Sequence, residues 1–169
     1  DVCSSDLADK GHVDAMNNYG IMAKEGDGIE KNLQEAAKYF KMAADKGLPR
    51  AMYNYAFMLQ YGKGIEFNKK EAAKYYKMAA NKGNINAMNN YAYMLKYGDG
   101  IDIDKNESIR YYKMAIDKGD TLAMNNYACM LKEGDGIDAD KKEAAKYYKM
   151  AADKGDINSI ANYAYLLYN

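Results

Sequence analysis

The sequence has no tryptophan, one proline, one histidine and two cysteines. So few cysteine and histidine side chains leave almost no material for a disulfide framework or a zinc site. The single proline and the lack of any long serine or glycine tract argue against a disordered linker protein. We therefore expect a folded chain that holds no metal and no cofactor.

An excess of charge of one sign is also missing. The 24 lysines and arginines are balanced by 24 aspartates and glutamates, so the formal net charge is zero. Nucleic-acid grooves and anionic membrane surfaces both favour a basic excess, so we expect neither as the main partner. No apolar run approaches the roughly 18 residues that a membrane-spanning helix needs. The partner class that remains is a protein or a peptide.

The main feature that the sequence does contain is a repeat of 36 residues. The repeat accounts for much of the high content of tyrosine (18), glycine (14) and methionine (12). The tyrosines that show the period best are Tyr19, Tyr55, Tyr91, Tyr127 and Tyr163. A fixed period of this length is typical of solenoids and propellers. We expect an array over residues 8–169 that begins with an isolated second helix and continues in the units 15–50, 51–86, 87–122 and 123–158, with a partial unit at 159–169.

Within each unit the apolar residues follow helical spacing. In the third unit they occupy positions i, i+3, i+4 and i+7 of a first helix, namely Met88, Tyr91, Ala92 and Leu95. A Gly-x-Gly turn ends this helix, and a second helix opens at Asp104 with Glu107 three residues later, as in a capping box. Nothing alternates with period two, which excludes a propeller blade. The pattern predicts an all-α solenoid of helix–turn–helix hairpins, which must stack to cover their apolar faces.

The two ends of the chain stand apart from this pattern. Residues 1–7 do not recur in the repeat, and no initiator methionine begins the sequence. We interpret this heptapeptide as a non-native scar, with a genuine linker as the alternative, and we expect the chain to be a fragment of a longer protein. At the other end, the apolar face of the partial unit lacks a second helix to cover it, so self-association is expected there.

The unit resembles the Sel1-like repeat, a relative of the tetratricopeptide repeat with a longer Gly-x-Gly turn. The resemblance covers residues 8–169 and departs from the family in using tyrosine where leucine or tryptophan is common. The residues that carry it in the third unit are Ala87, Tyr91, Ala92, Leu95, Gly98, Gly100, Ile101 and Asp104, then Tyr111, Tyr112, Ala115 and Gly119. The resemblance implies a right-handed solenoid whose first helices line a concave groove. It also implies a non-catalytic scaffold or adaptor.

Because the repeated positions set the fold, the varying positions are the candidates for recognition. The third, seventh and tenth positions of each unit share a face of the first helix, which we expect to lie opposite the packed face. Asparagine there can bind the backbone of an extended peptide, aromatic rings can pack its side chains, and lysine can meet its carboxylates. The predicted partner-binding residues are Tyr53, Phe57, Gln60, Asn89, Tyr93, Lys96, Asn125, Lys132 and Tyr165. The alternatives are a solvated face, or side chains that reach the core of the next unit.

Two other functions stay open at this point. The array can be a regulatory or targeting appendage of a larger protein, one with a kinase domain for example. Some cysteine-rich members of the superfamily are described as β-lactamases, which makes a hydrolase the third hypothesis. Those proteins carry a cysteine pair in each repeat, whereas Cys129 is the only cysteine inside this array, and no Ser-x-x-Lys motif is present. We therefore expect no enzyme, and the sequence does not fix a compartment.

Overall fold

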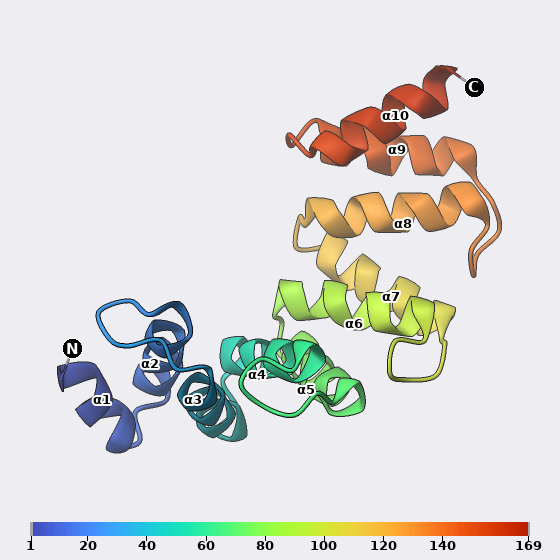
Figure 1. Cartoon of the computed structure of the whole chain (residues 1–169). Helices are drawn as coiled ribbons and strands as arrows, with labels where there is room; N and C mark the ends of the chain where they lie inside the picture. The colour runs from blue at the N-terminus through green and yellow to red at the C-terminus, as the bar shows by residue number, and fades with distance from the viewer. Residues whose placement is uncertain (1, 169) are drawn as a thin grey trace. The chain divides into compact units, whose positions relative to one another are not determined.

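The computed structural model describes residues 2–168, with side chains described from residue 6 onward, and its regular elements in this range are all α-helices (Figure 1). The helices are α1 (Val2–Asp9), α2 (Val13–Glu25), α3 (Leu33–Asp45), α4 (Pro49–Tyr61), α5 (Lys69–Asn81), α6 (Ile85–Tyr97), α7 (Lys105–Ile116), α8 (Thr121–Glu133), α9 (Lys141–Ala152) and α10 (Ile157–Tyr168). The even-numbered helices are the first helices of the repeats, and the odd-numbered helices are the second helices. The prediction of an all-α solenoid with 36-residue helix–turn–helix repeats is confirmed. Residues 2–7 of the range predicted as a scar or linker lie within α1, residue 1 lies outside the described residues, and the origin of the range stays a prediction.

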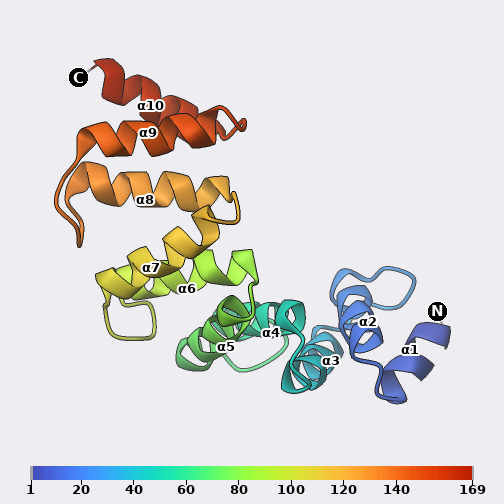
Figure 2. The same cartoon turned by 180° about the vertical axis from the view of Figure 1, so that it is seen from behind.

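The chain divides into two compact units, residues 1–87 and 88–169, which are described separately as unit 1 and unit 2. In unit 1 each helix from α1 to α5 packs against the next one along the chain. In unit 2 the same holds from α7 to α10, and Figures 1 and 2 both show α8, α9 and α10 lying one upon another. Contacts between elements adjacent in sequence therefore build both units, as expected for a repeat protein.

Paired tyrosine rings join the two helices of each repeat. The four pairs are Tyr19–Tyr39, Tyr55–Tyr75, Tyr91–Tyr111 and Tyr127–Tyr147. Their ring centroids are 4.6–5.0 Å apart, and their planes meet at 64–88°, so the edge of one ring faces the other. This arrangement suits the quadrupole of aromatic rings and adds to the energy of burial. Tyrosine thus occupies the positions between the two helices where leucine or tryptophan is common in the family.

Small residues next to these pairs let the helices approach closely. Ala56, Ala92 and Ala128 follow the first tyrosine of their pairs and are fully buried. In the first repeat the position is Gly20, where an added Cβ would lie 2.7 Å from the ring of Phe40. The methionines and the remaining tyrosines fill the space around this seam, with Met52, Met88 and Met124 each 1–2% exposed.

In unit 1, hydrogen bonds also tie each second helix to the second helix before it. The hydroxyl of Tyr39 donates to Asp9 Oδ1 at 2.7 Å, and that of Tyr75 donates to Asp45 Oδ1 at 3.2 Å. Burial and the bond to Asp9 raise the pKa of Tyr39 to about 12. These two tyrosines therefore act both within their own repeat and between repeats.

The turns are fixed by helix caps and by glycine. The second helices α3, α5, α7 and α9 each begin at an Asn or Asp whose side chain accepts a hydrogen bond of 2.8–3.0 Å from the backbone N–H of the glutamate three residues on. The pairs are Asn32/Glu35, Asn68/Glu71, Asp104/Glu107 and Asp140/Glu143. In the second and fourth repeats the second glycine of the turn contacts the preceding repeat: a Cβ on Gly64 would lie 2.4 Å from the Leu33 carbonyl, and one on Gly136 would lie 2.4 Å from Lys105 Cβ. In these two repeats the Gly-x-Gly turn therefore lies against the previous repeat.

We expect Asn68→Ala to lower the free energy of unfolding by about 1 kcal/mol, because the backbone N–H of Glu71 loses its acceptor. Asn68→Asp is the matched control, since Asp104 and Asp140 fill this position in later repeats, and it should stay within about 0.3 kcal/mol of the wild type. Urea unfolding followed by circular dichroism measures both. Equal destabilisation by Ala and Asp would show that the cap is not the cause.

Candidate functional site

The asparagines at the third position of the first helices are buried, so the alternative in which these side chains reach the next repeat describes them. Asn17, Asn89 and Asn125 are 1%, 5% and 9% exposed. Asn17 Oδ1 accepts a hydrogen bond from Asn54 Nδ2 at 3.1 Å, and Asn125 Oδ1 accepts one from Asn162 Nδ2 at 2.9 Å. Both donors lie on the first helix of the next repeat. The physical reason is that a first helix packs on two sides, against its own second helix and against the repeat that follows.

Asn89 makes a different bond across the same boundary. Its Nδ2 donates to Asp120 Oδ1 at 2.9 Å, and Asp120 also caps α8 by accepting from the backbone N–H of Ala123. The repeat pattern would place Asn126 as the donor to Asn89 Oδ1, but this bond is not formed. Among the described residues, Asn89 Oδ1 is left buried without a hydrogen-bond partner.

The tenth position is also largely taken up by the fold. Gln60 is 8% exposed and accepts a hydrogen bond of 2.9 Å from the Tyr76 hydroxyl. Lys96 is 9% exposed and lies 3.3 Å from the carboxylate of Asp135 in the next turn. Lys132 is half-buried and lies 3.8 Å from Glu133. The predicted Gln and Lys contacts with a ligand therefore compete with contacts inside the protein.

Asp135 is held between two lysines of the preceding repeat. Lys105 donates to one of its oxygens, and Lys96 pairs with the other. The hydrogen bond from Lys105, followed by the bond and charge of Lys96, lowers the pKa of Asp135 against the opposing effect of burial. Burial disfavours the charged form of Lys96, but bonds and charges from Tyr97 and Asp135 outweigh it and raise the pKa of Lys96. Lys96 and Lys105 thus bind a carboxylate, which Asp135 of the same chain supplies.

At the seventh position, aromatic side chains reach the surface in two of the repeats, and binding by them stays a prediction. Tyr93 and Tyr165 are 50% and 62% exposed, and Phe57 is half-buried. Tyr53, at a third position, is half-buried with its ring 5.8 Å from that of Tyr76. Cys129 takes the seventh position of the fourth repeat, where its sulfur accepts a hydrogen bond from Tyr148 at 3.1 Å.

The eleventh position was not among the predicted ones, and in two repeats it places a second aromatic ring beside the ring of the seventh position. Tyr61 and Tyr97 are each 56% exposed. The rings of Tyr61 and Phe57 are in tilted contact with centroids 4.6 Å apart, and those of Tyr97 and Tyr93 are in tilted contact at 4.5 Å. The i, i+4 spacing within each pair is a signal that could have found them, since such residues are neighbours on a helix surface. We call Phe57/Tyr61 and Tyr93/Tyr97 the exposed aromatic pairs; the first belongs to unit 1 and the second to unit 2.

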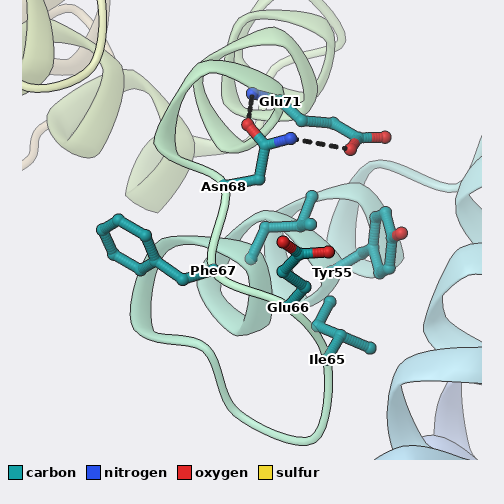
Figure 3. Close-up of a pocket in the computed structure, with 7 residues that line it drawn as sticks. Tyr55, Ile65, Glu66, Phe67, Asn68 and Glu71 are labelled. Atoms are coloured by element: carbon teal, nitrogen blue, oxygen red, sulfur yellow. Dashed lines mark hydrogen bonds between the residues drawn. The ribbon is translucent and has the colours of Figure 1, made fainter.

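A cavity of about 300 Å³ lies in the turn of the second repeat (Figure 3). Figure 3 shows Asn68 bonded to both the backbone and the side chain of Glu71, with Phe67 directed away from the cavity. Its lining is Tyr55, Leu59, Ile65, Glu66, Phe67, Asn68 and Glu71. The first repeat has a matching cavity of about 270 Å³ at the corresponding residues, including Tyr19, Asn32 and Glu35. These cavities belong to the helix cap and the turn that recur in each repeat, so they do not distinguish one repeat from another.

A catalytic arrangement is not present among the serines whose side chains the structure describes. Ser108 is fully buried and donates to the carbonyl of Ala92 at 2.7 Å, and Ser159 is fully buried and donates to Asn125 Oδ1 at 3.2 Å. Within the described part of the chain, no three His, Cys, Asp or Glu residues are grouped so that they could hold a metal ion. The described helices include none with the length and apolar character needed to cross a membrane.

The fold and the repeat define a class, the α-solenoids of helical-repeat proteins. A family model described as Sel1 repeat matches residues 13–48, 49–84, 85–120 and 121–156, each beginning two residues before the unit defined above. The chain therefore belongs to the Sel1 repeat family, as the resemblance predicted. A search of curated proteins finds no match to the chain.

Solved structures share this fold. A Sel1 repeat protein from Oxalobacter formigenes is 33% identical with a TM-score of 0.86, over 90% of this chain and 62% of that one. A protective antigen of uropathogenic Escherichia coli with an SLR fold is 26% identical with a TM-score of 0.93, over 98% of this chain and 36% of that one. Cysteine-rich protein B of Helicobacter pylori is 19% identical with a TM-score of 0.61, over 78% of this chain and 94% of that one. The chain thus spans less than two thirds of the length of the first two.

We expect Asp135→Asn to lower the free energy of unfolding by about 1 kcal/mol at neutral pH, because Lys96 and Lys105 lose their shared counter-ion. The pKa of Asp135 is lowered in the folded chain, so its contribution is present above the ordinary pKa of an aspartate and is lost as the pH falls through the folded value. The difference between variant and wild type should therefore shrink in acid.

Urea unfolding at neutral pH and at about pH 3, below the usual aspartate pKa, measures this difference. Asp138→Asn, an exposed residue three positions on, removes the same charge and is the control. Equal effects of the two variants, or a difference that does not change with pH, would contradict the role given to Asp135.

Proposed function

We propose that this chain is a non-catalytic interaction scaffold that binds a peptide segment of a partner protein through its exposed aromatic pairs. Sel1 repeat proteins generally mediate protein–protein interaction. The observation that carries the proposal is the pair Tyr93/Tyr97, with both rings half exposed on one face of α6. The fold does not demand these rings, since the same two positions hold Cys129 and Glu133 in the fourth repeat.

A pair of tyrosines in ring contact suits recognition on physical grounds. Tyrosine offers a large contact area and a polar hydroxyl, and it is enriched at the centres of protein interfaces. Because Tyr93 and Tyr97 already rest on one another, less side-chain freedom is lost when a ligand covers them. In unit 1, Phe57 and Tyr61 form the corresponding pair, with the ammonium group of Lys63 lying 4.8 Å from the centre of the Phe57 ring.

Parts of the sequence interpretation stay predictions. These are a single concave groove along all the first helices, a role as the appendage of a larger protein, and binding by the remaining predicted residues. A hydrolase function gains no support, because Ser108 and Ser159 use their hydroxyls inside the fold.

Self-association through α10 is a further prediction that no observation tests. Ile157, Leu167 and Tyr168 are 80%, 67% and 92% exposed on this helix. Exposed apolar surface of this kind favours association, which sedimentation at several protein concentrations would detect.

The proposal is tested by panning a random-peptide display library on the intact chain and measuring the affinity of the selected peptides. We expect Tyr93→Ala/Tyr97→Ala to weaken a substantial share of them by about tenfold or more, as loss of two interface aromatics does. Leu122→Ala/Met150→Ala removes two other exposed apolar side chains of unit 2 and should leave binding unchanged. No selected peptide, or equal binding by both double variants, would contradict the proposal. Circular dichroism verifies that both variants remain helical.

A further inference from the structure

In unit 2, the preceding repeat binds the acidic middle residue of a Gly-x-Gly turn. Asp135 is that residue in the fourth repeat, and its side chain is 20% exposed between Lys96 and Lys105 of the third repeat. The close approach of Gly136 to Lys105 brings the carboxylate there. This part of the repeat is therefore a place where a carboxylate is bound.

Unit 1 has the same backbone arrangement with the opposite charge. A shift of 72 residues relates Lys24 to Lys96, Leu33 to Lys105, and Lys63 to Asp135. The approach of Gly64 to Leu33 matches that of Gly136 to Lys105, so the turn sits at the same place on the preceding repeat. An ammonium group, Lys63, takes the position of the carboxylate.

The result is an open cavity of about 460 Å³ with a positive lining. Its lining residues are Lys24, Glu25, Lys31, Leu33, Phe57 and Lys63. Three lysines against one glutamate leave two positive charges in a chain whose net charge is zero. Asp27 and Glu30 lie in the turn of the first repeat, as Lys31 does, but they do not line this cavity.

The one carboxylate in the lining does not satisfy all three lysines. Glu25 lies 2.8 Å from Lys24, and both side chains keep substantial exposure. Among the described side chains, no carboxylate forms an ion pair with Lys31 or Lys63. The hydrogen bond and charge of Lys24, with smaller effects of Lys31 and Lys63, lower the pKa of Glu25. A second carboxylate in the cavity would therefore meet cations that the chain leaves available.

The apolar part of the lining defines the rest of the ligand. Leu33 and Phe57 are both half-buried, and Lys63 extends over the Phe57 ring. The cavity is larger than one carboxylate needs, and Leu33 and Phe57 can contact an aliphatic side chain beside it.

We propose that this cavity binds an aspartate or glutamate side chain of an acidic peptide segment, with the neighbouring apolar side chain of that segment packed on Leu33 and Phe57. The inference rests on the proposed function as a peptide-binding scaffold, and it names the class of peptide that unit 1 takes. The carboxylate is that of a side chain because an aspartate side chain, Asp135, occupies the equivalent place in unit 2.

The probe is the capped peptide acetyl-Gly-Asp-Leu-Asp-Gly-amide, which has no free terminal carboxylate, added to the ¹⁵N-labelled intact chain. We expect amide shifts concentrated in residues 24–33 and 57–64, with a dissociation constant on the order of 1 mM or tighter. Raising the salt should weaken binding several-fold, because screening reduces attraction between exposed charges. The peptide with asparagine in place of both aspartates should not bind.

The decisive variant is Lys63→Asp, which gives unit 1 the residue that fills the site in unit 2. We expect it to weaken binding of the probe by about tenfold or more, since one attractive charge is replaced by a repulsive one. Lys70→Asp makes the same charge change at an exposed position in the first turn of α5, outside the cavity, and should stay within about twofold of the wild type. The amide spectrum reports whether each variant keeps its fold.

Equal weakening by Lys63→Asp and Lys70→Asp, equal binding of the asparagine peptide, or shifts that map elsewhere would overturn the inference. The two proposals fail separately. Display-selected peptides that depend on Tyr93 and Tyr97 while the aspartate peptide does not bind would leave the scaffold function standing and remove the acidic site.

Discussion

The edge-to-face tyrosine pair between the two helices of each repeat is the contact on which the rest of the structure depends. It recurs four times with nearly constant spacing, from Tyr19–Tyr39 to Tyr127–Tyr147. By fixing how the first helix lies on the second, it decides which face of the first helix is left for the next repeat and which face is left for solvent. A hairpin joined in this way still has apolar surface uncovered, and neighbouring repeats supply the cover.

Polar side chains then determine how one repeat meets the next. Buried asparagines bond across the boundary, and Asp135 joins the fourth turn to Lys96 and Lys105. A buried polar group without a partner is costly, so these residues specify one register of stacking rather than merely adding contact area. The seventh and eleventh positions of the first helices and the middle residues of the turns are not fixed by the repeat. Repeats differ from one another at these places, and both binding proposals are placed there.

The fold could be predicted from the sequence because the periodicity, the Gly-x-Gly turns and the caps all indicate the same hairpin. The site could be predicted only in part. Asn89 and Lys96 lie on the face of α6 opposite its own second helix, as a helical wheel indicates, but a wheel does not show that the next repeat covers that face. Tyr93 is half exposed, so its side chain does not enter the core of the next repeat, which was one of the alternatives left open by the sequence.

The remaining features of the site depend on contacts between residues that are far apart in the sequence. A comparison of the repeats shows that Lys63 stands where other turns have aspartate, but it does not show that Lys63 meets Lys24 and Phe57 in one cavity. That information comes from the close approach of the turn to the preceding repeat, which only the folded backbone contains.

We expect the buried asparagines to hold neighbouring repeats together rather than to bind a ligand. A double-mutant cycle on Asn17→Ala and Asn54→Ala tests this, with the free energy of unfolding measured for all four proteins. We predict a coupling energy of about 0.5–1.5 kcal/mol between the two residues, with binding of the display-selected peptides unchanged. A coupling energy of zero, together with loss of peptide binding in the folded Asn17→Ala variant, would show instead that these side chains serve a ligand.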